Sequence, residues 1–437
     1  MYLSDDEWRG KKVTVMGLGR QGGGLGVTTW LCRQGASVTV SDQATRDELS
    51  QSVAKLAGYD VQLHLGGHDE RDFTTCDVLV ANPAIPFDSP HLAEATKAGA
   101  TITTEINLFL ARCPCPVIGI TGSAGKSTTT AMTGAILAKH LTAHVGGNIG
   151  KSLLEELEQI QPDHVVVLEL SSFQCSYLPL LGKSPHVAVV TNLQPNHLDR
   201  HTDMEDYGWA KRQVFAFQTE QDVLILNTAD VAVSQWATQA RGKVVYFSGD
   251  DKPPFELVLP GRHNQANAQA AFAAASQFGV TRKQAQEALL GCTGLPHRLE
   301  FVVERNGVSF YNDSKCTTPD EAVVALDAFA ARATVVIVGG YDKKIDMGNM
   351  CRKLAERAGA IIAVGQTGPA IADAVEALRG GGQSPAVLRV SRFDEAVAMA
   401  AHVAKPGQIV LLAPGCASFD QFKNYQERGD RFRELVK

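Results

Sequence analysis

The chain has 437 residues, more than one hydrophobic core usually organises, so we expect two or three domains. With 44% hydrophobic residues, 20% charged residues and a net charge of −6, it lacks the basic footprint of proteins that bind nucleic acid or anionic membranes. No apolar run approaches the ~20 residues that span a bilayer and no signal-peptide pattern opens the sequence, so we expect a cytoplasmic protein, by default a monomer.

Short apolar runs alternate with helix-length segments along the whole chain, which is typical of parallel sheets covered by helices. The first series of predicted strands comprises residues 13–17, 37–42, 61–66 and 77–83. The second comprises residues 117–122, 164–170, 186–193, 222–227 and 243–248. The third comprises residues 333–340, 360–365 and 408–415. We therefore predict an α/β protein with three domains.

Two Pro- and Gly-rich breaks mark the expected domain boundaries. The segment ARCPCPV at 111–117 has prolines that end a helix before a new strand, and GCTGLPHRLE at 291–300 precedes the last series. These breaks predict domains over residues 1–110, 111–297 and 298–437.

Nine cysteines are scattered along the chain without a regular spacing. An odd number without framework spacing predicts free thiols in a reducing compartment. The one tight pair, Cys113 and Cys115, lacks the second pair that would complete a structural zinc site.

A glycine-rich turn follows the first predicted strand. Gly17, Gly19 and Gly22 form a Gly-x-Gly-x-x-Gly pattern, and Asp42 lies twenty residues after Gly22 at the end of the second strand. This spacing is a dinucleotide-binding fingerprint and, taken alone, predicts NAD.

A second phosphate-binding signature follows the strand at 117–122. It reads TGSAGKST and comprises Gly122, Ser123, Gly125, Lys126, Ser127 and Thr128. The strict Walker pattern fails because Ile120 stands where its first glycine should be. The chemistry is retained, since small residues let backbone N–H groups converge on phosphate at a helix N-terminus while Lys126 neutralises charge and Ser127 reaches Mg²⁺. We therefore predict an ATP site here.

The shortened loop resembles the ATP loop of the Mur ligases and their folylpolyglutamate synthetase relatives. Further matches run in order to the C-terminus: GGNIG at 146–150, LELSSFQ at 168–174, NHLDRH at 196–201, GRHNQANAQAA at 261–271, GLPHRLE at 294–300, YNDSK at 311–315, VGGYDK at 338–343 and APGCASFDQFKNYQERGDRF at 413–432. The LPHR, NDSK and CASFDQFKN motifs are most similar to the branch of this family that adds D-glutamate to UDP-N-acetylmuramoyl-L-alanine. The resemblance covers essentially the whole chain.

The resemblance implies a Rossmann-like N-terminal domain that binds the UDP-linked substrate, a central P-loop-type ATPase domain, and a Rossmann-like C-terminal domain that binds the amino acid. UDP and NAD share ribose and pyrophosphate, so the glycine turn serves either ligand. The implied reaction forms an amide bond through an acyl phosphate, in peptidoglycan precursor synthesis and hence in cell-wall growth, cell shape and cell division.

The resemblance also implies the residues that hold ATP and metal. Two Mg²⁺ ions are expected, with Ser127, Glu169, His197 and a carbamate formed on Lys211 as ligands. The family commonly has Asp or Glu before this histidine, whereas this chain has Asn196, and Ala124 replaces a common Asn of the loop. The remaining contacts to ATP and the acyl phosphate are implied for Asn264, Asn267, Arg298, Asp313 and Lys315.

Substrate contacts are implied at both ends of the chain. Gln21, Asp42 and Asn148 would bind the sugar nucleotide, although Ala84 departs from the Ser-Pro-Gly of many relatives. The D-glutamate pocket is implied for Thr317, Lys343, Ser418 and Tyr425. Position 425 is often Phe in the family, and the segment CTTPDEA after NDSK also departs from its usual continuation.

Two alternatives remain open from the residues. One is another ligase of this superfamily that uses a different amino acid or acceptor. The other is an NAD-dependent oxidoreductase or NAD-sensing module that carries an ATP loop, although the sequence shows no obvious hydride-transfer constellation.

Overall fold

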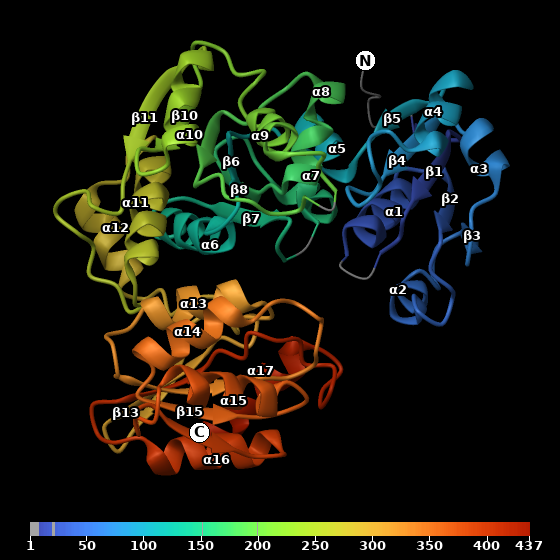
Figure 1. The fold of residues 1–437 in the computed structure, drawn as a ribbon. Helices are drawn as coiled ribbons and strands as arrows, with labels where there is room; N and C mark the ends of the chain where they lie inside the picture. The colour runs from blue at the N-terminus through green and yellow to red at the C-terminus, as the bar shows by residue number, and fades with distance from the viewer. Residues whose placement is uncertain (1–7, 20–21, 151, 199) are drawn as a thin grey trace. The chain divides into compact units, whose positions relative to one another are not determined.

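The computed structural model describes residues 8–19, 22–150, 152–198 and 200–437. Their contacts divide the chain into two compact units, which we describe separately. The first holds the chain up to Pro253 together with Ala266–Ala285, and the second holds Pro254–Gln265 and Gln286–Lys437. Figure 1 labels many of the elements in both units. The three sheets confirm the predicted three-domain α/β architecture, whereas the exact domain boundaries stay predictions.

The N-terminal part of the first unit is a parallel sheet in the order β3-β2-β1-β4-β5, as expected for a Rossmann-like domain. Its strands are β1 (Lys12–Met16), β2 (Ser37–Asp42), β3 (Val61–Leu65), β4 (Val78–Ala81) and β5 (Thr101–Thr103). Its helices are α1 (Gly23–Arg33), α2 (Ser50–Lys55), α3 (Glu70–Thr74), α4 (Pro90–Lys97) and α5 (Glu105–Arg112). As predicted, α5 ends just before the prolines of the first break.

The second sheet of this unit is also parallel and has the order β11-β10-β9-β6-β8-β7. Its strands are β6 (Val117–Thr121), β7 (Ala143–Gly147), β8 (Val165–Glu169), β9 (Val187–Val190), β10 (Val223–Asn227) and β11 (Lys243–Phe247). Every residue of β6, β8 and β9 is buried, which is why these strands are continuous apolar runs rather than alternating ones.

Helical segments connect the strands of this second sheet. They are α6 (Lys126–Leu137), η2 (Leu153–Gln159), α7 (Ser172–Ser176), α8 (Leu178–Leu181), α9 (Met204–Arg212), α10 (Val231–Gln235) and η3 (Trp236–Gln239). Two further helices, α11 (Arg262–Ser276) and α12 (Arg282–Leu289), follow before the third sheet begins.

The third sheet lies in the second unit and has the order β12-β13-β17-β14-β15-β16, with β12 antiparallel to β13 and the other pairs parallel. Its strands are β12 (Glu300–Arg305), β13 (Val308–Asn312), β14 (Thr334–Val338), β15 (Ala360–Ala363), β16 (Ala386–Arg389) and β17 (Ile409–Leu412). Its helices are α13 (Pro319–Asp327), α14 (Gly348–Arg357), α15 (Gly368–Leu378), α16 (Phe393–Val403) and α17 (Tyr425–Val436).

The side chains of alternate residues of β14 pack in two different apolar cores of the second unit, one on each face of the sheet. Val336 and Val338 pack with α13, α14 and α15, whereas Val335 and Ile337 pack with α16 and α17. The helices therefore cover both faces of the sheet, as Figure 1 shows. This arrangement leaves the strand ends and their loops as the places where ligands can bind.

Within the first unit, α5 connects the two sheets and is held from both sides. The Asn107 side chain donates to the Tyr177 carbonyl at 2.7 Å, and the Tyr177 hydroxyl donates to the Ile85 carbonyl at 3.0 Å. At the other end of α5, the Arg112 guanidinium lies 5.4 Å and 5.1 Å from the ring centres of Trp8 and Trp30. These two rings meet edge to face at 5.6 Å, so this end of α5 is anchored by aromatic and cation–π contacts.

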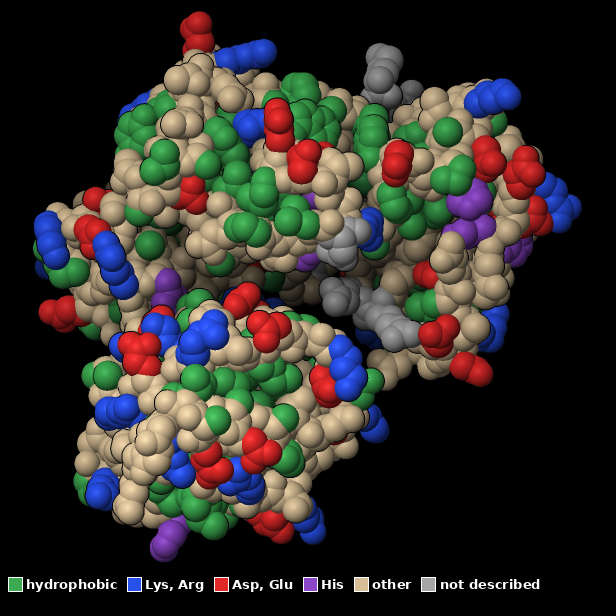
Figure 2. Space-filling view, in the orientation of Figure 1, with side chains coloured by type: hydrophobic (Ala, Val, Ile, Leu, Met, Phe, Trp, Pro, Cys, Tyr) green, Lys and Arg blue, Asp and Glu red, His purple; other side chains and the backbone are tan. Residues whose placement is uncertain are grey.

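All nine cysteines are free thiols, as predicted, and the Sγ atoms of Cys113 and Cys115 lie 3.7 Å apart. On the face shown in Figure 2, Lys and Arg side chains are interspersed with Asp and Glu, in line with the small net charge. Among the described residues, no helix combines the length and apolar character that crossing a membrane requires.

Candidate active site

The predicted ATP loop connects the buried strand β6 to the N-terminus of α6. Gly122 and Gly125 have φ values of 145° and 83°, which favour glycine. A Cβ atom at Gly122 would overlap the Thr191 hydroxyl, and one at Gly125 would overlap the Asn267 amide oxygen. The predicted contact residue Asn267 therefore packs directly on the loop, and both glycines are required by close approach as well as by conformation.

The loop is also held by residues that follow β9, which the sequence analysis did not single out. Asn192 Oδ1 accepts a hydrogen bond from the Ala124 N–H at 2.8 Å, and the Ser123 hydroxyl donates to the Gln194 carbonyl at 2.9 Å. β9 is the direct neighbour of β6 in the sheet, and Asn192 lies near the end of the predicted strand at 186–193, which was the signal available. These bonds fix the loop backbone from one side.

Two lysines converge on a single carbonyl oxygen of the loop. Lys126 Nζ donates to the Gly122 carbonyl at 2.9 Å and to the Ser123 carbonyl at 3.0 Å. Lys211 Nζ, from α9, donates to the same Gly122 oxygen at 2.8 Å. Burial, and after it the positive charge of Lys126, lower the pKa of Lys211 to about 7. Near neutral pH, Lys211 is therefore divided between ammonium and free amine.

Glu169 ends β8 with its carboxylate buried at 1% exposure. Oε1 accepts a hydrogen bond from the Asn148 side chain at 2.7 Å, whereas Oε2 has no hydrogen-bond partner among the described residues. A buried carboxylate oxygen without a partner is costly, and Mg²⁺ prefers ligands of this kind. Glu169 therefore fits a magnesium site, and Asn148 orients it.

His197 lies in the loop after β9 and has a left-handed backbone with a φ of 56°. Its backbone N–H donates a hydrogen bond to Asn196 Oδ1 at 2.9 Å. Its exposed imidazole ring meets the Phe173 ring edge to face, with the ring centres 5.1 Å apart. Within the described ranges, no group of three or more His, Cys, Asp or Glu is arranged to hold a metal. A metal here would therefore need further ligands such as Ser127, which lies in the first turn of α6, and a modified Lys211.

The glycine turn after β1 is closed by Asp42. Its Oδ2 atom accepts hydrogen bonds from the Leu18 N–H at 2.8 Å and the Gly19 N–H at 3.2 Å. The Asn82 side chain donates to the Gly17 carbonyl at 3.2 Å from the end of β4. Asp42 thus holds the turn itself, and the predicted contact Gln21 lies outside the described residues.

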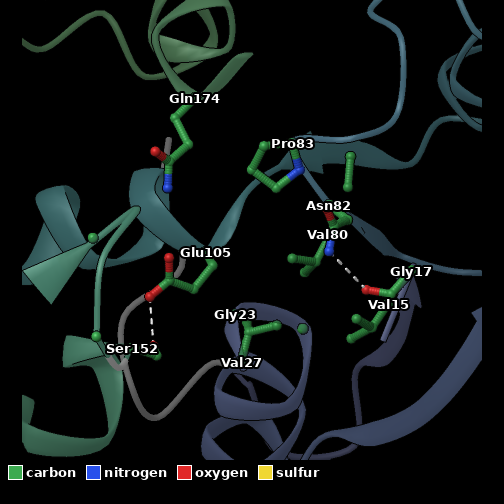
Figure 3. Close-up of a pocket in the computed structure, with 14 residues that line it drawn as sticks. Val15, Gly17, Gly23, Val27, Val80, Asn82, Pro83, Glu105, Ser152 and Gln174 are labelled. Carbon is green, nitrogen blue, oxygen red and sulfur yellow. Dashed lines mark hydrogen bonds between the residues drawn. The ribbon is translucent and has the colours of Figure 1, made fainter. Parts of the chain in front are cut away.

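A cavity of roughly 60 Å³ opens beside this turn, between the two sheets of the first unit (Figure 3). It is lined by Val15, Gly17, Gly23, Gly24, Val27, Val80, Ala81, Asn82, Pro83, Glu105, Gly147, Gly150, Ser152 and Gln174. The many glycines leave backbone groups accessible, which suits a phosphate-containing ligand. Glu105 was missed by the sequence analysis because TTEINL reads as an ordinary helix start.

In the second unit, Asp313 follows β13 and accepts a hydrogen bond from the Leu299 N–H at 3.1 Å. Burial raises the pKa of Asp313 to about 7, against the opposing effects of that hydrogen bond, Arg298 and Lys315. Lys315 Nζ lies 5.9 Å from the ring centre of Tyr425 at the start of α17. The structure thus brings together four predicted site residues at this sheet edge.

The loops after β14 and β17 carry further predicted residues and are joined by the hydrogen bond from the Tyr341 N–H to the Ala417 carbonyl at 2.9 Å. Lys343 is exposed and Ser418 is buried next to this junction. Because β13, β17 and β14 are adjacent and parallel, their carboxyl ends share one edge, where Thr317 also follows β13. Asn264 is buried elsewhere in this unit, and its side chain donates to the Pro260 carbonyl at 2.7 Å.

Three domain families match successive parts of the chain. They are the Mur ligase MurD-like N-terminal domain over residues 11–104, the Mur ligase middle domain over residues 120–257, and the Mur ligase glutamate ligase domain over residues 297–416. Among solved structures, MurC of Thermotoga maritima, a UDP-N-acetylmuramate-alanine ligase, is similar in fold, with a TM-score of 0.61 and 20% identity over 98% of this chain and 99% of that one. MurF of Acinetobacter baumannii has a TM-score of 0.57 and 19% identity over 84% and 92%.

Curated relatives are similar over nearly the full length and carry the name UDP-N-acetylmuramoylalanine–D-glutamate ligase. The protein of Symbiobacterium thermophilum is 40% identical over 453 residues, which cover 98% of each chain. That of Roseiflexus sp. is 39% identical, again over 98% of each chain, and that of Acetivibrio thermocellus is 37% identical over 98% of this chain and 96% of the relative. The chain therefore belongs to the Mur ligase family.

Proposed function

We propose that this protein is the ATP-dependent ligase that joins D-glutamate to UDP-N-acetylmuramoyl-L-alanine. The substrate pair is supported by the shared name of relatives at 37–40% identity over nearly the whole chain. The observation that carries the chemistry is the convergence of Lys126 and Lys211 on the Gly122 carbonyl, beside the N-terminus of α6. At this position Lys126 can neutralise a triphosphate that must react with an anionic carboxylate, and Lys211 can carry the carbamate proposed below.

The first step forms an acyl phosphate. The terminal alanine carboxylate of the acceptor attacks the γ-phosphorus, the bond to the bridging oxygen breaks, and ADP leaves with that electron pair. Lys126 exchanges its bonds to the Gly122 and Ser123 carbonyls for the β- and γ-phosphate oxygens. Arg298 is proposed to contact the γ-phosphate, and Lys315 the acyl phosphate.

The second step forms the amide. The amino group of D-glutamate attacks the acyl carbon, and phosphate leaves as the amine loses a proton. Lys343, Thr317, Ser418 and Tyr425 are proposed to hold the two carboxylates of D-glutamate, so that its amine is presented to the acyl carbon. Their loops lie at one edge of the third sheet, which supports this assignment.

The metal and its ligands belong to the same proposal. Two Mg²⁺ ions, when bound, supply positive charge that offsets repulsion between the carboxylate and the triphosphate. Ser127, Glu169 and His197 would hold them together with a carbamate on Lys211. The orphaned Oε2 of Glu169 supports a metal beside it. The lowered pKa of Lys211, at about 7, supplies the free amine that reacts with CO₂.

The remaining contacts complete the binding of both nucleotides. Asn264, Asn267 and Asp313 are proposed to bind the adenosine part of ATP. Asn148, Asp42 and Gln21 are proposed to bind the sugar nucleotide near the cavity of Figure 3. We propose that the protein acts as a monomer in the cytoplasm and serves peptidoglycan synthesis, and through it cell shape and division.

The deciding experiment is an ADP-release assay with UDP-N-acetylmuramoyl-L-alanine against a panel of D- and L-amino acids. We expect release that requires both the acceptor and D-glutamate. A preference for another amino acid would assign the protein to a different ligase of the superfamily. A nicotinamide-dependent absorbance change without ADP release would refute ligase activity.

A further inference from the structure

Glu105 is a buried acid that faces the cavity of Figure 3 and has no part in the reaction described above. It is the first residue of α5 and is 8% exposed. One carboxyl oxygen, Oε1, accepts a hydrogen bond from the Ser152 hydroxyl at 2.5 Å. Figure 3 shows the other oxygen turned away from Ser152, on the side of Gln174. Oε1 is thus engaged in a hydrogen bond within the protein, and the other carboxyl oxygen is available to a ligand in the cavity.

The groups packed around Glu105 favour its neutral form. The helix η2 presents Glu155, whose negative charge acts against ionisation, and Ser152, whose hydrogen bond opposes this effect. The helix α1 presents Thr29, an uncharged residue whose hydroxyl donates to Glu155 Oε1 at 3.1 Å. The sequence of α8 holds no titratable residue, and Gln174 on α7 is also neutral. Burial is the largest effect and raises the pKa of Glu105 to about 7.

An anion in the cavity would strengthen this preference. Our proposed function places the diphosphate of the sugar nucleotide beside the glycine turn and Asn148, and this inference rests on that placement. Two phosphate charges next to a carboxylate of low exposure repel it, whereas a protonated carboxyl can donate a hydrogen bond to the ligand. Glutamate at this position is therefore compatible with an anionic ligand only in its neutral form.

We propose that Glu105 is a binding residue for the sugar nucleotide that takes up a proton when this ligand enters the cavity, and donates its O–H to it. Binding is then coupled to pH. Below neutral pH the carboxyl is already protonated and affinity is constant. At higher pH a proton must be captured from solvent, so the Kd of the sugar nucleotide rises by up to about tenfold per pH unit.

The test is isothermal titration of the full-length protein with UDP-N-acetylmuramoyl-L-alanine at pH 8, in buffers of different ionisation enthalpy. The diphosphate diester of this ligand does not titrate in that range, so proton uptake reports on the protein. We expect wild type to take up more than about half a proton per site. Glu105→Gln, which mimics the neutral carboxyl, should bind without this uptake and with a Kd that no longer rises from pH 7 to 9.

Glu158→Gln is the matched control, because it neutralises an exposed acid of η2 and should leave the proton count unchanged. Uptake that persists in Glu105→Gln, or a wild-type Kd that stays flat from pH 7 to 9, would overturn the inference. The wild-type pH series needs no variant and so remains informative if Glu105→Gln folds poorly. Absence of any binding to wild type would instead contradict the proposed function.

Discussion

Two lysines donate hydrogen bonds to the Gly122 carbonyl, but their surroundings differ. Lys126 is partly exposed at the start of α6, whereas Lys211 is 1% exposed on α9. Desolvation, and after it the nearby Lys126 charge, lower the pKa of the buried amine to about 7. The same carbonyl therefore orients one residue suited to bind phosphate as a cation and one suited to react as an amine.

Replacing Lys126 with Ala should lower kcat by roughly 10²-fold or more, because a compact charge on the β- and γ-phosphates is lost in the transition state. The measurement is phosphate release at saturating concentrations of all three substrates. Lys139→Ala is the control, because Lys139 is an exposed lysine just beyond the end of the same helix. This substitution should leave kcat unchanged. Near-normal turnover of Lys126→Ala would rule out the role.

Lys211→Ala should be nearly inactive and should regain part of its activity with acetate or formate, which can replace a missing anionic ligand. Lys211→Arg should remain inactive with the same additives, because a guanidinium brings charge of the wrong sign and blocks the space. The measurement is the activity of the two variants over a series of acetate or formate concentrations. Rescue of Lys211→Ala but not of Lys211→Arg would support a carbamate on Lys211. Full activity of Lys211→Ala without additives would refute it.

At the scale of elements, the loops after β13, β17 and β14 form the proposed amino-acid pocket. Lys343→Ala should raise the KM for D-glutamate by roughly 10- to 100-fold and leave the KM for ATP nearly unchanged, since a lost contact to a carboxylate is worth about 1.5–3 kcal/mol. Initial-rate kinetics with each substrate varied in turn provide the measurement.

The neighbouring Lys344 offers a matched control for this change. Its ammonium pairs with Asp342 at 2.6 Å and its side chain is 84% exposed, so Lys344→Ala should leave both constants unchanged. An equal rise in both KM values for Lys343→Ala would place that lysine outside the pocket.

Strands with long apolar runs could be predicted from the sequence, whereas some short strands of mixed polarity could not. β6 and β8 are buried throughout, so their apolar runs stand out, and both were expected. β12, β13 and β16 were not expected, because their residues are partly exposed and of mixed polarity. The form of such strands depends on pairing with neighbouring strands, which one sequence window does not display.

The site was predictable where a residue lies in a phosphate-binding motif or matches a family motif. Lys126 belongs to a loop whose residue pattern predicts phosphate binding. Lys211 was identified only through the resemblance to the family. Glu105 and Asn192 escaped prediction because each acts through partners distant in sequence. Ser152 is 47 residues from Glu105, and Ala124 is 68 residues from Asn192.

At the scale of the whole molecule, Lys126 lies in the first unit and Arg298 in the second, and the proposed function assigns both residues to the same ATP. We therefore expect ATP and the acceptor together to compact the protein by bringing the units onto one ligand. Small-angle scattering should show a smaller radius of gyration with both ligands than without them. Lys126→Ala with the same ligands is the control and should compact less, whereas an unchanged wild-type curve would contradict closure.

The aromatic contacts around Arg112 give the protein an optical reporter of its own. Trp8 and Trp30, two of its four tryptophans, are buried at 1% and 4% exposure against a guanidinium that sits at the end of α5. Trp209, at 41% exposure, emits from a wetter environment on the helix that carries Lys211. With Trp209 and Trp236 both replaced by Phe, the remaining fluorescence comes from the two buried indoles at Arg112. A red shift on adding ligand would then report directly on water reaching the segment that links the first two sheets.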